Sequence, residues 1–144
     1  MKKLLPFLLL TVMLMAFGVE DSKAASANIT NLYTQHNQFH NGNKGMFIRF
    51  DYNVKGLRGK TVTAQVTLYK SNGKKIHFIN GNIVTYTLTG TPGYDVTNYN
   101  GLWVFFPYSF NLPAGHTDCY ALVKIIGPSG KVLTSRKTTF WFNK

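Results

Sequence analysis

Residues 45–70, GMFIRFDYNVKGLRGKTVTAQVTLYK, contain two runs in which apolar and polar side chains alternate. The apolar residues occupy the even positions from Met46 to Val54 and again from Val62 to Leu68. Successive side chains of a β-strand point to opposite faces, so a period of two indicates a strand with one buried face. The stretch therefore predicts two strands joined by a short basic connection that contains glycine. The expected core residues of this pair are Met46, Ile48, Phe50, Val62, Ala64 and Val66.

Turn signals recur along the rest of the chain, roughly every 8–12 residues, as in β-sandwiches. Asn72-Gly73 predicts a tight hairpin, because both residues tolerate the positive φ that such a turn requires. The segments between turns are rich in β-branched and aromatic residues. We predict an all-β, antiparallel β-sandwich of about seven to nine strands, with a closed barrel as the alternative. The further strands are expected at residues 28–36, 75–79, 83–89, 102–106, 119–126 and 131–142, with a break near Arg136 in the last.

The N-terminus has the layout of a secretory signal peptide. Residues 1–3 are basic, residues 4–19 are apolar, and residues 20–27 are polar and end in small side chains. An uncleaved anchor is the alternative, but the apolar run is short of the roughly 20 residues that span a bilayer, and Pro6 interrupts it. We therefore predict a cleavable signal peptide at residues 1–27 and one sandwich domain at residues 28–144. The domain is expected to be periplasmic, cell-surface or secreted, with no stable membrane span after cleavage.

The chain is strongly basic, with 16 Lys and Arg against five Asp and Glu and a formal net charge of +11. Removal of residues 1–27 takes away three lysines and two carboxylates, which leaves +10. Lys55, Arg58 and Lys60 form one cluster, and a second cluster surrounds Asn72-Gly73, at the other end of the intervening strand. These clusters predict a diffuse positive field that favours an anionic polysaccharide, lipid head groups or an acidic protein. The alternative is a solvated surface that only maintains solubility. Nucleic acid is not expected, because an exported chain without a recognition motif offers no reason for it.

His116, Asp118 and Cys119 bring together the residue types of a nucleophilic triad. In an extended segment, however, residues three apart point to opposite faces, so the His116 and Cys119 side chains are not expected to meet. Cys119 shares its parity with apolar neighbours and is expected to be a buried thiol. It is the only cysteine, so an intrachain disulfide is excluded. We expect no catalytic residue and no cofactor.

His36 and His40 are four residues apart, which places two ligands on one face of a helix. On a strand the same spacing separates them by roughly 13 Å, too far to share one ion. The surrounding Asn, Gln and Gly residues indicate a loop, and no third ligand is obvious nearby. We therefore expect no metal site.

Aromatic residues are concentrated between positions 86 and 108, interleaved with Thr, Asn and Asp. If the strand at residues 102–106 directs its even positions inward, Trp103 lies on its other face. We favour a central strand that is buried on both faces; the alternative is a partly exposed platform for a sugar or a protein. Trp141 poses the same question. The candidate ligand-binding residues are Tyr86, Tyr94, Tyr99, Trp103, Tyr108, Lys55, Arg58 and Lys60.

One ordered set of turn and core residues runs through residues 30–143. It consists of His36-Asn37, Gly42, Gly45-Met46, Ile48, Asn72-Gly73, Thr91-Pro92-Gly93-Tyr94, Tyr99, Phe106-Pro107-Tyr108, Gly130 and Leu133. The pattern resembles a family of uncharacterised Ig-like β-sandwich domains in exported bacterial proteins. The resemblance implies a fold, and it provides no catalytic residue to carry over.

Taken together, these features favour an exported, non-enzymatic β-sandwich module that binds a cell-surface or extracellular partner. The alternative is a structural or assembly component that associates with itself through an edge strand.

Overall fold

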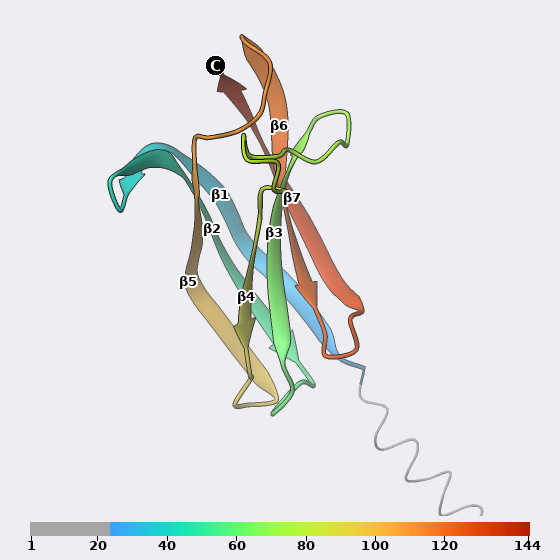
Figure 1. The fold of residues 1–144 in the computed structure, drawn as a ribbon. Helices are drawn as coiled ribbons and strands as arrows, with labels where there is room; N and C mark the ends of the chain where they lie inside the picture. The colour runs from blue at the N-terminus through green and yellow to red at the C-terminus, as the bar shows by residue number, and fades with distance from the viewer. Residues whose placement is uncertain (1–23) are drawn as a thin grey trace, which may run out of the picture.

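Two antiparallel β-sheets form the protein in a computed structural model that describes residues 24–144 (Figure 1). One sheet has the strand order β1-β2-β5 and the other β4-β3-β6-β7. The fold is the predicted all-β sandwich, and its two separate sheets exclude a single closed barrel. The strands are β1 (Ser26–His40), β2 (Asn43–Lys55), β3 (Val62–Lys70), β4 (Thr85–Gly90), β5 (Val96–Pro107), β6 (His116–Ile126) and β7 (Val132–Asn143).

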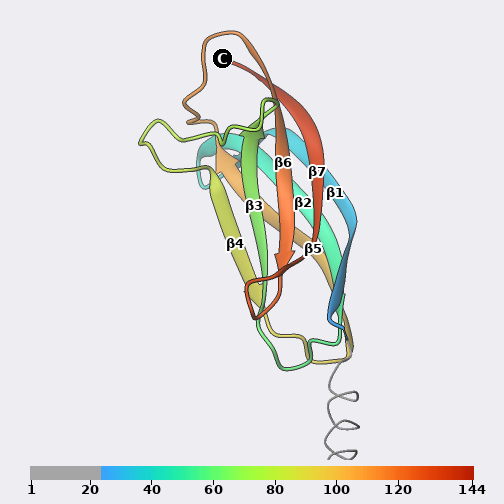
Figure 2. The same cartoon turned by 90° about the vertical axis from the view of Figure 1, so that its right-hand side faces the viewer.

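The connections repeatedly change sheet. The chain crosses between sheets from β2 to β3, from β4 to β5 and from β5 to β6, so neither sheet is made from one continuous segment. Figure 2 shows the four-stranded sheet in front of the three-stranded one. The predicted signal peptide, residues 1–27, lies almost entirely outside the described residues. Residues 24–144 include no helix that is long and apolar enough to cross a membrane.

The core consists of the inward faces predicted from the alternating pattern. Every even position from Met46 to Val54 and from Val62 to Leu68 is buried, which confirms the prediction for β2 and β3. In β6 the alternate positions from Cys119 to Ile125 complete the opposing wall. Burial of this apolar surface is the main stabilising contribution, at roughly 25 cal/mol per Å².

The two sides of the sandwich differ. On one side β1 lies against β7, and Arg136 Nη1 donates a hydrogen bond to the Ile29 carbonyl oxygen at 3.3 Å. On the other side β4 and β5 are not paired with each other. Tyr99 fills the gap at one end, where a Cβ on Gly90 would lie 3.0 Å from the Tyr99 hydroxyl oxygen. This unpaired β4–β5 side borders the candidate site.

The hairpin at Asn72-Gly73 forms, but the strand predicted at residues 75–79 does not. Gly73 N–H bonds to the Lys70 carbonyl at 2.9 Å, as expected of a turn. Beyond it, residues 75–79 make only isolated bridges. The reason is that β4 pairs with β3 from Val62 to Thr67, so the returning chain can bond only to the short stretch of β3 next to the turn, from Leu68 to Lys70.

Other strands also differ from their predicted ranges. β1 continues to His40, because Asn37 adopts a positive φ of 57° at an irregularity in its pairing with β2. β5 begins at Val96, and β7 is continuous through Arg136. The predicted break near Arg136 is therefore wrong: the hydrogen bond of this side chain to β1 gives it a role within a regular strand.

Candidate functional site

Four aromatic rings gather on the outer surface of the β1-β2-β5 sheet. They belong to His40, Phe47, Trp103 and Phe105, and we call them the aromatic face. Five ring pairs among them have centroids 5.1–5.9 Å apart at tilted or edge-on angles. These distances and angles are the preferred ones for interacting rings. The cluster is therefore a packed unit on the surface.

The strand register places these rings. Phe47 of β2 lies opposite Phe105 of β5, and Arg49 lies opposite Trp103. His40 comes from the end of β1, next to the turn at Asn41 and Gly42, whose φ values are 50° and 77°. Two successive positive φ values are typical of the tight type I′ hairpin turn, which Asn-Gly favours.

A bulge in β5 decides which of its side chains face outward. Before the bulge Tyr99 pairs with buried Tyr52, and after it Leu102 pairs with buried Phe50. The inward positions thus change from odd to even, because an extra residue reverses the alternation. Gly101 sits at the bulge with a φ of 69°, and its N–H donates a 2.6 Å hydrogen bond to Asp51 Oδ1. Without the bulge, Trp103 would face the core.

Arg49 adds a positive charge to the aromatic face. Its guanidinium carbon lies 4.9 Å from the centroid of the Phe47 ring, and its Nε donates to Gln35 Oε1. A cation at this distance over a ring is attracted by the electrons of the ring face. The Arg49 side chain is thereby held in place beside Trp103.

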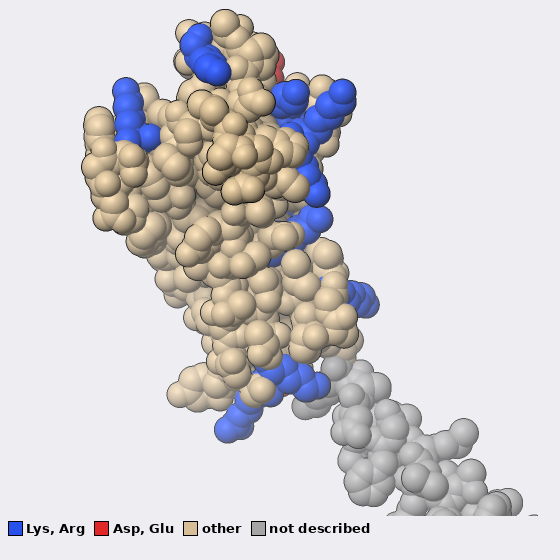
Figure 3. Space-filling view, viewed as in Figure 1, with Lys and Arg blue, Asp and Glu red and all other residues tan. Residues whose placement is uncertain are grey.

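A hollow of about 430 Å³ continues from the aromatic face into the unpaired β4–β5 side. Trp103 and Tyr86 line it, with 43% and 54% of their surface exposed. Neither β4 nor β5 contains a charged residue. In Figure 3 the surface over these two strands is free of Lys and Arg, which lie above, below and to its right. Apart from Arg49, the site is thus an aromatic surface without charged side chains, and further cations lie around it.

The preferred interpretation of Trp103 as buried on both faces is wrong. β5 is an edge strand, and the described residues form only two layers, so a side chain on the outer face of β5 has no layer above it. Trp141 is likewise exposed, at 60%. Residues 102–106 are all apolar, which favours burial on both faces, but the same pattern arises when an exposed aromatic surface covers one face of a strand.

The other candidate aromatic residues do not join this site. Tyr99 stacks on Tyr52 with ring centroids 4.8 Å apart, and its hydroxyl is buried without a hydrogen-bond partner in the described structure. Burial, reinforced by Tyr99, raises the pKa of Tyr52 to about 12. Tyr99 is therefore a packing residue at the closed end of the β4–β5 side.

Tyr108 lies on the β1–β7 side. Its hydroxyl is 3.0 Å from His36 Nδ1 and accepts a 2.9 Å hydrogen bond from the Asn37 N–H. Burial lowers the pKa of His36, which favours the neutral imidazole, and a neutral Nδ1 accepts a hydrogen bond that the Tyr108 hydroxyl group donates. Burial raises the pKa of Tyr108, opposed by the Asn37 hydrogen bond. These three residues of the sequence pattern thus hold together the irregular part of β1.

Tyr94 lies with the first basic cluster, at one end of the sandwich. Gly59 N–H bonds to the Pro92 carbonyl at 2.8 Å, which ties the loop that carries Arg58 to the loop that carries Tyr94. Tyr94 is 74% exposed, and Lys55, Arg58 and Lys60 are exposed beside this junction. The second cluster, Lys70, Lys74 and Lys75, lies beyond the other end of β3, as predicted.

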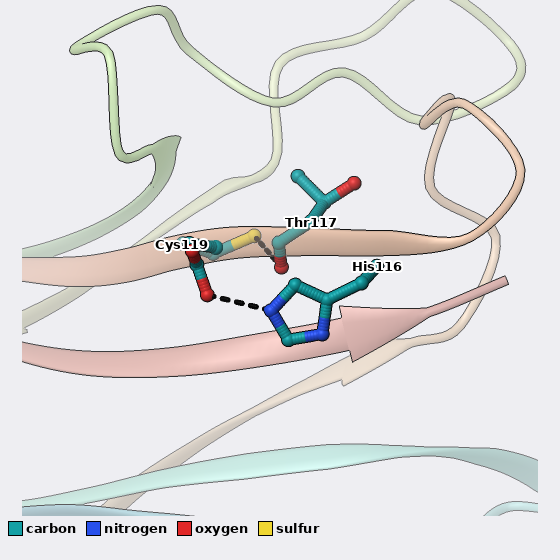
Figure 4. A network of polar contacts seen from close by, with 4 residues as sticks. His116, Thr117 and Cys119 are labelled. Atoms are coloured by element: carbon teal, nitrogen blue, oxygen red, sulfur yellow. Dashed lines mark hydrogen bonds and ion pairs between the residues drawn. The ribbon is translucent and has the colours of Figure 1, made fainter.

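The residues of the candidate triad do not form one. His116 Nε2 lies 2.8 Å from Asp118 Oδ1, whereas Cys119 Sγ contacts the Thr117 carbonyl oxygen at 3.5 Å (Figure 4). The thiol is on the core side and 2% exposed. Burial, then the Asp118 charge, raises the pKa of Cys119 to about 11 against the opposing effect of Lys70. A thiol with this pKa is protonated at neutral pH and is a poor nucleophile.

The side chains of His36 and His40 lie in different surroundings. His36 contacts Tyr108 and the ring of Phe140, while His40 belongs to the aromatic face. No three His, Cys, Asp or Glu side chains are grouped for metal binding within residues 24–144.

Sequence reasoning identified Tyr86 and Trp103 but missed His40, Phe47, Arg49 and Phe105. Phe47 and Arg49 occupy odd positions of β2, whose side chains point away from the core. Their meeting with Trp103 depends on the β2–β5 register, for which the local pattern provides no signal.

Comparisons with known proteins add little to this picture. No family model and no curated protein matches the chain. Among solved structures, one described as "X-ray structure of Northeast Structural Genomics Consortium target SoR45" is similar over 84% of each chain, with 11% identity and a TM-score of 0.25. We draw nothing about function from a similarity this weak.

Proposed function

We propose that the protein is an exported, non-enzymatic β-sandwich module that binds a cell-surface or extracellular partner through the aromatic face and the adjoining hollow. The observation that carries this proposal is the exposure of Trp103 and Tyr86 beside a packed group of rings. Trp, Tyr and Arg are the residues most enriched where binding energy is concentrated in protein interfaces. The finer family assignment, to the Ig-like domains that the sequence pattern resembles, is part of this proposal.

The chemistry of the site favours an acidic protein as the partner over an anionic polysaccharide. The hollow is lined by Leu88, Leu102 and Val104 as well as by rings, and such a lining suits apolar side chains. The cations around it would accelerate the encounter with an acidic partner, which is a salt-sensitive effect.

Binding of the processed protein to isolated cell envelope tests the proposal. Trp103→Ala should weaken binding at least tenfold, equivalent to about 1.4 kcal/mol, because a central aromatic contact is lost. Val132→Ala, which truncates an exposed apolar side chain of β7 that lines neither this hollow nor any other described here, is the control and should bind as the unaltered protein does. Protease treatment of the envelope should abolish binding, whereas survival of binding would identify a polysaccharide instead.

The proposal fails if Trp103→Ala binds normally while about 1 M salt, where the Debye length is about 3 Å, removes all binding. In that case only the general positive charge would be responsible.

Self-association is a second candidate function, favoured by the lack of charge on β4 and β5. Edge strands usually carry charges that prevent pairing with another chain, and these two do not. If copies pair along β4, sedimentation should show dimers that increase with concentration and disappear in Thr87→Lys. Gln65→Lys, at the paired position on the neighbouring inner strand β3, should leave the dimer intact. A monomer at all concentrations would rule this function out.

A further inference from the structure

A second hollow, of about 390 Å³, lies on the outer face of the four-stranded sheet, with Trp141 at its edge. Trp141 of β7 is opposite Asp118 of β6, and Thr139 is opposite Tyr120. These side chains alternate with buried Cys119 and Phe140, so they point away from the core. The volume falls within the range of small-molecule sites, about 300–1,000 Å³.

The indole of Trp141 is held by its neighbours. The His116 ring stacks on it, with centroids 5.4 Å apart and an angle of 28° between planes, and His116 Nε2 lies 2.8 Å from Asp118 Oδ1. This chain of contacts orients the ring and the carboxylate together. A ligand would therefore meet them already placed, which lowers the ordering cost of binding.

Lys137 and Tyr120 also line the hollow, and Tyr69 supports Tyr120 without lining it. Tyr69 stacks on Tyr120 with centroids 5.1 Å apart, and Lys137 Nζ lies 5.0 Å from the centroid of the Tyr120 ring. Ser71 adds a hydroxyl group from the hairpin, and its N–H bonds to the Asp118 carbonyl. The hollow thus combines one exposed flat ring with a carboxylate, an ammonium group and hydroxyl groups.

We propose that this hollow binds an uncharged pyranose sugar, with one face of the sugar against Trp141. A pyranose ring presents C–H groups on its face, which suit an indole, and hydroxyl groups around its rim. The Asp118 carboxylate accepts hydrogen bonds from hydroxyl groups, and the Lys137 ammonium donates to them. The site lies on the other sheet from the aromatic face, and the inference does not rest on the proposed function.

Charged ligands fit this hollow less well. The place that an organic cation would take over the Tyr120 ring is already taken by Lys137, and the net charge of +10 on the described chain repels cations. An anion against Trp141 would meet the Asp118 carboxylate. An uncharged polyhydroxylated ring uses both groups without either penalty.

The two tryptophans of the chain allow a direct test. In Trp103→Phe the only indole is Trp141, and in Trp141→Phe it is Trp103. The processed protein is titrated with cellotriose and with the trisaccharide of N-acetylglucosamine, up to about 10 mM so that weak millimolar binding is seen. We expect a saturable change in emission in Trp103→Phe with at least one sugar, and no change in Trp141→Phe.

Asp118→Ala in the Trp103→Phe background should weaken the sugar affinity at least tenfold, because its hydroxyl acceptor is lost. Ser135→Ala is the matched control, because Ser135 of β7 lies on the same outer face of the sheet but does not line the hollow. The inference is overturned if neither sugar changes the emission, if both single-tryptophan proteins respond alike, or if about 1 M salt abolishes the response. Partner binding that depends on Trp103 would be unaffected by any of these results.

Discussion

Gly45 supports the aromatic face by having no side chain. A Cβ at this position would overlap the Phe106 carbonyl oxygen and would lie 2.7 Å from Cζ of the Phe105 ring. Gly45→Ala should therefore lower the free energy of unfolding by about 1–3 kcal/mol, as overpacked sites do. Urea unfolding measures this. Gly93→Ala, where a Cβ meets no atom within 4 Å, should be neutral or slightly stabilising, and equal effects of the two substitutions would contradict the steric explanation.

The buried thiol of Cys119 makes the stability of the fold depend on pH in the alkaline range. Its folded pKa of about 11 exceeds the ordinary value of 9.0, so the folded state holds the proton more tightly than the unfolded state. The contribution of the protonated thiol to the free energy of unfolding is complete below pH 9 and declines as the pH rises toward 11, with a loss of about 1 kcal/mol by pH 10.

Denaturant titrations at pH 7 and pH 10 check this dependence. The stability difference between the unaltered protein and Cys119→Ala should shrink by that amount at the higher pH. Tyr52 titrates equally in both proteins and cancels from the comparison. A difference that is constant with pH would mean that the thiol does not titrate as proposed.

At the scale of the strands, the Asp51–Gly101 contact holds the bulge that directs Trp103 outward. Asp51→Ala should cost about 1–2 kcal/mol of unfolding free energy, because hydrogen bonds to charged acceptors contribute about 1.5–3 kcal/mol and this one is partly exposed to water. Asp51→Asn keeps an acceptor oxygen and should recover most of the loss in thermal unfolding. An Asn variant as unstable as the Ala variant would show that the hydrogen bond is not the cause.

Strand identity was largely predictable, and strand order was not. The alternation around Phe50 and Val66 depends only on neighbouring residues in the chain. The apolar positions that it identifies are therefore the ones that face the core in the structure. The failure at residues 75–79 has a different origin: that segment has strand-like residues, but β4 occupies the edge of β3 that it would need. Competition between segments for one edge is not visible in either segment alone.

At the scale of the whole molecule, the basic clusters lie at opposite ends of the sandwich and should act additively. Substitution of Lys55, Arg58 and Lys60 by Gln, or of Lys70, Lys74 and Lys75 by Gln, should each lower the salt concentration that elutes the protein from immobilised heparin, and by similar amounts. The physical reason is that a diffuse field depends on total charge. Loss of retention in one triple variant alone would reveal a localised anion site instead.

The sequence was sufficient for the fold class, the inward faces of the regular strands and the separation of the charge clusters, because each depends on local alternation and on chain length. Only the tertiary structure decided that β5 is an edge strand, that a bulge reverses its alternation, and that His40 and Phe47 meet Trp103. These features arise from pairings between residues far apart in the chain. The same is true of the hollow beside Trp141, where the β6–β7 register places Asp118 opposite the indole.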